Sequence, residues 1–357
     1  MKPKRIIFTG GGTLGHVMPN IPLIRYFQDE GWEVAYIGSK KGIEREKMNE
    51  LNIKYFPIRS GKLRRYFDLQ NFLDIFNVSI AIIQAFFIFI RWRPNVVFSK
   101  GGYVALPPVI GAWITRVPIV IHESDMTPGL TTKLSKRFAT VICTAFKNTL
   151  RYLPANKTTY TGLPVRDLVF EASETIGRQF LGEQIDKPIL LVFGGSLGAQ
   201  FLNNLAREHV KNGNLSSFHV VNICGRGQLD PDMNTFSNYQ QFESLSDEFL
   251  HVMKSAEFVI TRGGATSLFE LLAMKKPHPV VPLPKSVSRG DQIDNATYFR
   301  DLGVSDFIEE EHFEWDTLRE KMEMIQQNWP SILTKLDEMA FSQSSEKVRS
   351  ILMEKSS

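Results

Sequence analysis

The sequence predicts an α/β protein with two similar domains, each built on a sheet of parallel strands. Its 357 residues are too many for one ordinary domain and fit two. Short apolar runs alternate with helical patterns along the chain. The stretch 5–27 also has a near-copy at 188–210, since each is an apolar run followed by Gly-Gly-Thr/Ser-Leu-Gly and a helical pattern. Two nucleotide-binding-like halves are the simplest account of this repeat.

Eight apolar runs are predicted to be buried strands, and nearly all of them end in glycine, serine, histidine or glutamate. They are 5–10, 34–38, 95–102, 119–124, 189–196, 219–225, 258–264 and 278–284. Ligand groups in open α/β sheets lie at the carboxyl ends of strands, so we expect the site there. Gly and Pro interrupt the pattern at 161–167, the expected linker. We therefore expect domains over 1–163 and 164–341, and a charged helix over 342–357 that packs on the first domain.

Bulk properties exclude several classes of protein. The formal net charge is only +4, and no nucleic-acid partner is predicted. Cys143 and Cys224 lack metal or redox spacing, so we expect buried thiols in a reducing compartment. The first apolar run has only three residues before a glycine, which does not suit a secretory signal. The chain is expected to stay in the cytoplasm.

The segment 76–90 is strongly apolar, but its 15 residues include three polar ones, so it is too short and too polar for a membrane span. Between residues 59 and 100, seven basic residues stand against two acidic ones. The basic residues are Arg59, Lys62, Arg64, Arg65, Arg91, Arg93 and Lys100. An apolar helix with basic flanks suits the surface of an anionic membrane. The alternative is a helix buried against the sheet.

Four glycine-rich turns follow predicted strands, at 10–13, 101–103, 194–196 and 263–266. Such turns present backbone N–H groups to anions, so a phosphate-rich ligand is predicted. No Gly-Lys-Ser/Thr follows any of them, which excludes a P-loop. The second strand ends in Gly-Ser rather than in an acidic residue, which argues against a nicotinamide dinucleotide. No cofactor is expected.

Candidate acids and bases follow two of the strands. His16 lies just inside a predicted helix N-terminus, where the dipole favours a neutral ring that could act as a general base. The alternative for His16 is packing or capping of the loop. His122, Glu123, Ser124 and Asp125 end another strand and are candidate bases or acceptor contacts, with helix capping as the alternative for the last two. The histidine spacing does not suit a metal site, and no metal is predicted.

The second half offers groups that suit a nucleotide sugar. Arg166 could bind a diphosphate bidentately, or form a surface ion pair instead. Glu270 could hold both hydroxyls of a ribose, or lie on a solvated helix face. Asp291, Gln292 and Asn295 form a polar set suited to sugar hydroxyls.

Seven motifs occur in order: GGGTLGH, SKGGYVALPP, IHESD, TGLPVR, FGGSLGA, TRGGATSLFE and RGDQIDNA. Together they closely resemble the MurG family of N-acetylglucosaminyltransferases, over about residues 5 to 350. The resemblance implies a GT-B fold, with parallel sheets of two Rossmann-like domains facing across a cleft. It implies UDP-N-acetylglucosamine as donor on the C-terminal half, and undecaprenyl-diphospho-N-acetylmuramoyl-pentapeptide as acceptor on the N-terminal half. The implied reaction is inverting transfer in peptidoglycan synthesis at the cytoplasmic face of the cell membrane, alongside other cell-wall enzymes.

The family's motifs assign roles to residues of this chain. His16 would lie at the reacting centre. The residues expected near UDP-N-acetylglucosamine are Thr13, Leu14, Gly15, Arg166, Ser196, Glu243, Glu270 and Gln292. The residues expected near the acceptor and its diphosphate are Gly11, Gly12, Gly102, Tyr103 and Glu123.

Three departures from the family pattern leave alternatives open. Leu14 replaces a frequent glycine, and Asp291-Gln292 replaces a glutamine pair, which leaves Gln292 as the expected sugar contact. Ser124-Asp125 replaces Gln-Asn, so either His16 or Asp125 could be the general base. Two rival functions also stay open: a UDP-N-acetylglucosamine 2-epimerase, which shares the fold, and a non-catalytic sugar-nucleotide-binding scaffold.

Overall fold

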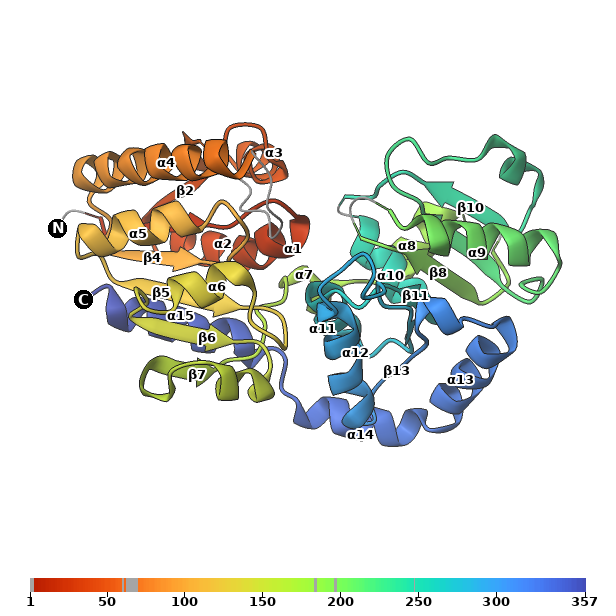
Figure 1. The fold of residues 1–357 in the computed structure, drawn as a ribbon. Coiled ribbons are helices and arrows are strands. Elements are labelled where there is room, and N and C mark those ends of the chain that lie inside the picture. Colours follow the sequence, from red (N-terminus) through yellow and green to blue (C-terminus); the bar gives the residue numbers. More distant parts are fainter. Residues whose placement is uncertain (1–2, 60, 62–69, 183–184, 196–197, 247) are drawn as a thin grey trace. The chain divides into compact units, whose positions relative to one another are not determined.

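The computed structural model describes residues 3–59, 61, 70–182, 185–195, 198–246 and 248–357 (Figure 1). The chain forms two compact units. Unit 1 comprises Met1–Arg166 and Phe341–Ser357, and unit 2 comprises Asp167–Ala340. Each unit has a parallel sheet with helices on both of its faces.

Unit 1 contains a seven-stranded parallel sheet in the order β3-β2-β1-β4-β5-β6-β7. Its strands are β1 Arg5–Thr9, β2 Glu33–Ser39, β3 Lys54–Ile58, β4 Val96–Ser99, β5 Ile119–Glu123, β6 Val141–Thr144 and β7 Thr158–Tyr160. Its helices are α1 Leu14–Val17, α2 Ile21–Asp29, α3 Ile43–Glu50, α4 Gln70–Trp92, α5 Leu106–Ile114, α6 Leu130–Ser135 and α15 Gln343–Lys355. Short 3-10 turns cover Met18–Asn20, Lys147–Tyr152 and Ala155–Lys157. The strand order reverses between β1 and β4.

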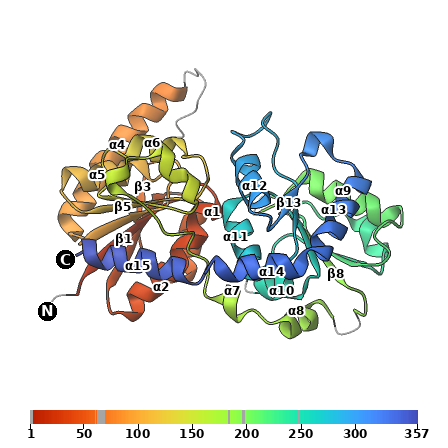
Figure 2. The ribbon, with the colours of Figure 1, turned by 90° about the horizontal axis from the view of Figure 1, so that it is seen from below.

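The sheet of unit 1 is buried on both faces, because successive residues of a strand point to opposite sides. Ile6 and Phe8 of β1 belong to a core shared with α2 and α15. Ile7 belongs to the opposite core, shared with α4 and α5. The C-terminal helix α15 packs beside α2 and β4 (Figure 2), so the end of the chain completes the first unit.

Unit 2 contains a six-stranded parallel sheet in the order β10-β9-β8-β11-β12-β13. Its strands are β8 Ile189–Phe193, β9 His219–Ile223, β10 Tyr239–Phe242, β11 Phe258–Thr261, β12 Pro279–Val280 and β13 Asp306–Phe307. Its helices are α7 Leu168–Glu171, α8 Glu174–Leu181, α9 Gln200–Lys211, α10 Glu248–Ser255, α11 Ala265–Ala273, α12 Asp291–Asp301, α13 Trp315–Gln327 and α14 Trp329–Glu338. Short 3-10 turns cover Pro231–Thr235 and Glu310–His312. Helices α9 and α13 share one core with the sheet.

The predicted fold class is confirmed, since both sheets are parallel and flanked by helices. Each of the eight predicted runs contains an observed strand. Among the described residues, five further strands, β3, β6, β7, β10 and β13, were not predicted, and four of them are edge strands. The predicted thiols Cys143 and Cys224 are both free and buried.

Candidate active site

Both units place glycine-rich turns where the strand order reverses. In unit 1, Gly10–Gly12 follow β1 and Gly101–Gly102 follow the neighbouring strand β4. In unit 2, Gly194–Gly195 follow β8 and Gly263–Gly264 follow the neighbouring strand β11. Ligands of open α/β sheets bind at such switch points, beyond the carboxyl ends of the strands. The fold therefore gives each unit one candidate binding site built from two glycine turns.

The first glycine loop is tightly enclosed by its own domain. Gly12 has a φ of +91°, and a Cβ on it would lie 2.7 Å from Cε1 of Tyr103. A Cβ on Gly102, whose φ is +80°, would collide with the carbonyl oxygen of Gly11. The two glycine turns of unit 1 thus pack backbone against backbone, and any side chain at these positions would force them apart.

A carboxylate of the protein itself occupies part of this loop. Glu44 is fully buried, and its Oε1 accepts hydrogen bonds from the N–H of Ser39 at 3.0 Å and from the hydroxyl of Ser39 at 2.6 Å. Its Oε2 accepts a hydrogen bond from the N–H of Gly12 at 3.4 Å. Glu44 therefore takes one of the N–H groups that such a loop would otherwise offer to a ligand anion. Nothing in the sequence distinguished this glutamate from a solvent-facing helix residue.

His16 is held by a hydrogen bond to the second glycine turn. Its Nδ1 lies 3.1 Å from the carbonyl oxygen of Lys100. Because a carbonyl oxygen only accepts, Nδ1 carries a proton in this contact, and Nε2 is the ring nitrogen that could take up a proton. The amide of Asn20 donates to the carbonyl oxygen of His16 at 3.2 Å, which further fixes the turn.

His16 lies just inside the start of a helical run, as the sequence predicted. Helix α1 spans four residues and continues through a 3-10 turn into α2, and Val17, Met18, Asn20 and Ile21 at the junctions all keep right-handed helical dihedrals. The hydrogen bond from Nδ1 to the carbonyl oxygen of Lys100 sets the tautomer of His16.

Lys100 differs from the sequence-based expectation, which counted it among the basic residues that flank the apolar helix. It is instead 1% exposed. Its Nζ donates to Nδ1 of His122 at 2.8 Å and to the hydroxyl of Ser124. Burial lowers the pKa of Lys100 to about 7, although Glu123 and Asp125 oppose this shift.

His122 continues this buried chain of hydrogen bonds. Its Nε2 donates to the carbonyl oxygen of Gly162 at 2.8 Å, which leaves Nδ1 to accept from Lys100. Burial, followed by the charge of Lys100, holds the pKa of His122 well below its usual range. His122 is thus a buried, neutral link between Lys100 and Gly162 rather than an exposed base.

Glu123 and Asp125, the other strand-end candidates, differ in what they contact. Glu123 is 5% exposed, and its two carboxylate oxygens accept the N–H groups of Asp125 and Gly129, each at 3.0 Å. It therefore shapes the turn that carries Asp125. The side chain of Asp125 is half-buried and directly follows Ser124, the residue that Lys100 contacts.

The second glycine loop has more room around it. Gly195 has a φ of +90°, and a Cβ on it would meet no described heavy atom within 4 Å. A Cβ on Gly198 would instead collide with the carbonyl oxygen of Cys224, so this glycine fixes the path into α9. Helix α9 spans 12 residues and has a full macrodipole at its N-terminus. The predicted diphosphate ligand Ser196 lies outside the described residues.

Gln292 organises the other glycine turn of unit 2. Its Oε1 accepts from the N–H of Gly263 at 3.1 Å and from the N–H of Leu283 at 3.0 Å. Asn295 is fully buried and donates to the carbonyl oxygen of Gly263 at 3.1 Å, so it supports the turn from inside. Asp291 pairs with Arg289 at 3.1 Å. Of the predicted polar set, Gln292 alone keeps an NH₂ group that these bonds do not use.

The remaining predicted residues of the donor site have distinct surroundings. Glu270 is 3% exposed in α11, which contradicts the alternative of a solvated helix face. Glu243 is half-buried, and its Oε1 accepts from the N–H of Gly227 at 2.6 Å, which ties β10 to the turn after β9. Arg166 is half-buried and ends the first of the two chain segments that form unit 1. In the described part of the chain, no three His, Cys, Asp or Glu side chains gather as a metal site.

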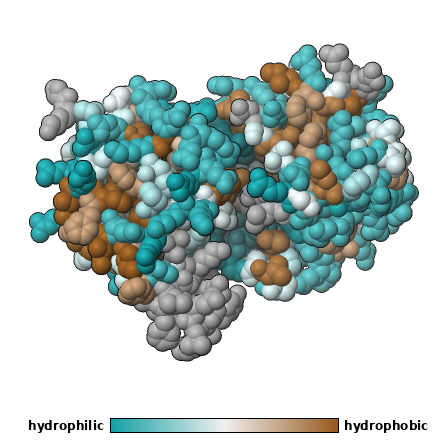
Figure 3. Space-filling model, turned by 90° about the horizontal axis from the view of Figure 1, so that it is seen from above, coloured by the Kyte–Doolittle hydropathy of each residue, from teal (hydrophilic) through white to brown (hydrophobic). Residues whose placement is uncertain are grey.

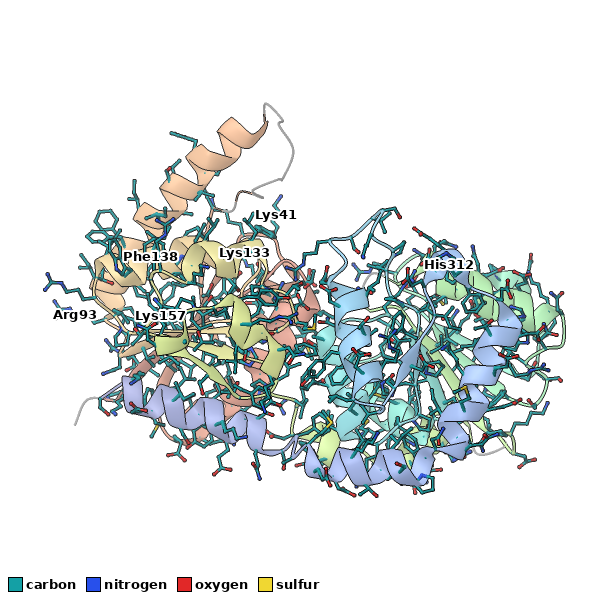
Figure 4. The ribbon with its side chains drawn as sticks, turned by 60° about the horizontal axis from the view of Figure 1, so that its bottom comes forward. Lys41, Arg93, Lys133, Phe138, Lys157 and His312 are labelled. Carbon is teal, nitrogen blue, oxygen red and sulfur yellow. The ribbon has the colours of Figure 1, made fainter. Side chains whose placement is uncertain are left out.

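One face of α4 is buried and another is exposed and apolar. Ala81, Ala85 and Phe89 pack on the sheet. The apolar strip consists of exposed side chains from α4 and its neighbour α5: Phe76, Ile83, Phe87, Ile90, Trp113 and Ile114. Apolar residues gather over unit 1 in Figure 3, and Arg93 extends outward at the end of α4 (Figure 4). No helix among the described residues has both the length and the apolar character that a membrane span needs.

Comparisons with known proteins place the chain among glycosyltransferases. The glycosyltransferase family 28 N-terminal domain matches residues 6–144, and the family 28 C-terminal domain matches residues 189–352. A UDP-N-acetylglucosamine–N-acetylmuramyl-(pentapeptide) pyrophosphoryl-undecaprenol N-acetylglucosamine transferase from Clostridium tetani is 46% identical, over 95% of this chain and 94% of its own.

Two solved structures share the fold. The crystal structure of MurG from Acinetobacter baumannii has a TM-score of 0.75 at 24% identity, covering 99% of this chain and 100% of its own. A putative UDP-N-acetylglucosamine 2-epimerase from Listeria monocytogenes has a TM-score of 0.65 at 13% identity, covering 98% of this chain and 95% of its own. The fold is therefore GT-B, and a transferase and a putative epimerase share it.

Proposed function

Because the chain belongs to the MurG family of N-acetylglucosaminyltransferases, within glycosyltransferase family 28, we propose that it converts lipid I to lipid II in peptidoglycan synthesis. It moves N-acetylglucosamine from UDP-N-acetylglucosamine to the 4-hydroxyl of undecaprenyl-diphospho-N-acetylmuramoyl-pentapeptide. The observation that carries this proposal is 46% identity to a transferase so named, over nearly the full length of both chains. The fold alone does not carry it, because an epimerase shares that fold.

The donor binds to unit 2 in this proposal. The room around Gly195 and the N-terminus of the 12-residue helix α9 suit a diphosphate, with Arg166 and Ser196 as further ligands. The buried carboxylate of Glu270 suits the ribose hydroxyls. Gln292 holds the Gly263 turn with its carbonyl oxygen, so its NH₂ group is placed to donate to the sugar.

Glu243 marks the uracil end of the donor site. Its carboxylate is engaged with the N–H of Gly227, so its backbone, rather than its side chain, is the group that recognises the base. An amide backbone offers both a donor and an acceptor, which is what the edge of a uracil requires. This arrangement suits a position where the family often has an aliphatic residue.

The acceptor binds to unit 1, around the two glycine turns. Glu44 competes for the N–H of Gly12. Gly11 and Gly12 therefore contribute mainly by allowing the turns to pack closely. Gly102 and Tyr103 lie against this first glycine loop, and Glu123 shapes the turn after β5. Thr13, Leu14 and Gly15 of the same loop are the residues that the family's motif assigns to the donor.

The reaction is a direct displacement at the anomeric carbon. The oxygen of the acceptor's 4-hydroxyl forms a bond to that carbon, and the bond from it to the diphosphate oxygen breaks with its electron pair. UDP leaves, and the configuration inverts. The hydroxyl proton passes to Nε2 of His16 or to the carboxylate of Asp125. The N-terminus of α9 and Arg166 stabilise the charge that develops on the leaving diphosphate.

We propose that the apolar strip binds the cytoplasmic face of the membrane, where the lipid-linked acceptor of the proposed reaction would lie. Exposed apolar side chains beside Arg91 and Arg93 suit an anionic bilayer surface. Replacing Ile83 and Phe87 together by Gln should weaken binding to vesicles of anionic lipid at least tenfold, since each buried side chain contributes about 1.5–3 kcal/mol. Val287→Gln is the matched control, because Val287 is 72% exposed in unit 2. Equal binding of both variants would contradict this orientation.

One assay separates the proposed function from its rivals. Labelled UDP-N-acetylglucosamine is supplied with a short-chain lipid acceptor, and the product's linkage is read by NMR. A β-1,4-linked disaccharide and free UDP support the transferase. The mannosamine epimer, formed from the donor without acceptor, identifies an epimerase, and donor binding without any product identifies a scaffold.

A further inference from the structure

We propose that Lys100 is a positioning residue of the transfer reaction, which holds both candidate proton acceptors in place. Its backbone carbonyl orients His16, and its side chain holds the turn that carries Asp125. This inference rests on the proposed function, because it assigns a role within that reaction.

The backbone of Lys100 joins the two glycine turns of unit 1. Its N–H donates to the carbonyl oxygen of Thr9 at the end of β1, at 2.8 Å. Its own carbonyl oxygen accepts from Nδ1 of His16 at 3.1 Å. This peptide group therefore sets the tautomer of His16 and helps to hold its ring.

The side chain of Lys100 reaches in the other direction, toward the end of β5. It donates to Nδ1 of His122 at 2.8 Å and to the hydroxyl of Ser124. Nε2 of His122 in turn donates to the carbonyl oxygen of Gly162, so the far end of this chain is anchored too. Ser124 and Asp125 are neighbours in sequence, and loss of the lysine contact would release the turn that presents Asp125.

Lys100 also supplies a positive charge near Asp125. The charged or titratable groups around its side chain are His122 and Glu123 from β5, Asp125 from the following turn, and Cys143 from β6, while His16 contacts its backbone carbonyl oxygen. Burial lowers the pKa of Lys100 to about 7, so the cation predominates below that pH. A nearby cation lowers the pKa of a carboxylate and of an imidazole alike, because it favours the anion of one and disfavours the cation of the other. The pKa of the base is therefore expected to rise when the cation is removed, whether the base is His16 or Asp125.

The experiment compares Lys100→Met with the wild type and measures kcat across pH at saturating donor. We expect kcat to fall at least tenfold, while KM for UDP-N-acetylglucosamine stays within about twofold. The pKa of the acid limb of kcat should rise by about one unit, because the cation that lowers the pKa of the base is gone. Lys276→Met is the control: Lys276 is a half-buried lysine in unit 2, whose pKa burial lowers to about 8. It should leave the acid limb unmoved.

A second variant decides the matter if Lys100→Met does not fold. Ser124→Ala keeps the cation and removes one of its contacts, so kcat should fall while the acid limb stays at the wild-type pH. Two results would overturn the inference. One is an unchanged kcat in Ser124→Ala, and the other is a kcat that falls in Lys100→Met by the same factor at every pH, with no shift of the acid limb. Failure of the wild type to form disaccharide would instead overturn the proposed function, so the two failures are distinguishable.

Discussion

Gly12 of the first loop and Gly195 of the second occupy equivalent places in the repeated Gly-Gly-Thr/Ser-Leu-Gly pattern. Their backbones are nearly identical, with φ of +91° and +90°. Their surroundings are not. A Cβ on Gly12 would press on the ring of Tyr103, and the N–H of Gly12 contacts the buried carboxylate of Glu44. A Cβ on Gly195 would meet no described atom within 4 Å.

The helices that follow the two loops differ as well. Helix α1 after the first loop has four residues and continues through a 3-10 turn into α2, whereas α9 after the second loop is an uninterrupted helix of 12 residues. In the proposed function, the first loop presents His16 for proton transfer and the second loop binds the phosphates of the donor. The same sequence pattern would then serve two different tasks in the two units.

His16→Ala should have the largest effect. Loss of a general base costs about 10²–10⁴-fold in rate, and we expect this loss in kcat. The affinity for UDP-N-acetylglucosamine, measured by titration calorimetry, should change little, because the proposal assigns the phosphates, ribose and uracil of the donor to unit 2. If affinity falls as much as kcat, His16 contributes to donor binding rather than to proton transfer, and the division of roles between the loops is wrong.

Glu44→Gln tests the carboxylate in the first loop and should have a moderate effect on stability. A Gln NH₂ group opposite the N–H of Gly12 cannot accept its hydrogen bond, and losing a hydrogen bond to a buried charged group costs about 1.5–3 kcal/mol. The unfolding transition of unit 1 should shift down by several degrees, about 4–8 °C. Scanning calorimetry measures this shift, and Glu46→Gln on the same helix is the control because its side chain is exposed. Equal shifts of the unfolding temperature in both variants would contradict the proposed stabilising role of the buried Glu44 carboxylate.

The sequence predicted the sheet centres far better than their edges. Strands such as β1 and β8 are continuous apolar runs, because they are buried on both faces. The missed edge strands read Lys-Tyr-Phe-Pro-Ile, Thr-Thr-Tyr, Tyr-Gln-Gln-Phe and Asp-Phe, with polar residues that obscure the pattern. An edge strand is less buried than a central one, so its sequence carries a weaker signal.

The candidate site was predictable in its glycines and not in its buried charges. The glycine turns could be recognised because tight turns with a positive φ favour glycine, and glycine is visible in the sequence. Lys100 and Glu44 could not be recognised, because a buried charge and a solvated one are the same letter until their partners are known. Lys100 was even counted as a solvated flank of the apolar helix, although its partners lie at the end of β5.

The most direct test of this division of roles is the affinity of the full-length chain for UDP in Gly12→Ala and Gly195→Ala. The two glycines have almost the same positive φ, so the backbone strain introduced by alanine is matched. Titration calorimetry should show UDP binding at least about tenfold weaker in Gly195→Ala, because its Cβ enters the space proposed for the diphosphate. Gly12→Ala should bind UDP within about twofold of the wild type. Equal weakening in both variants, or weakening in Gly12→Ala alone, would contradict the assignment of donor binding to the second loop.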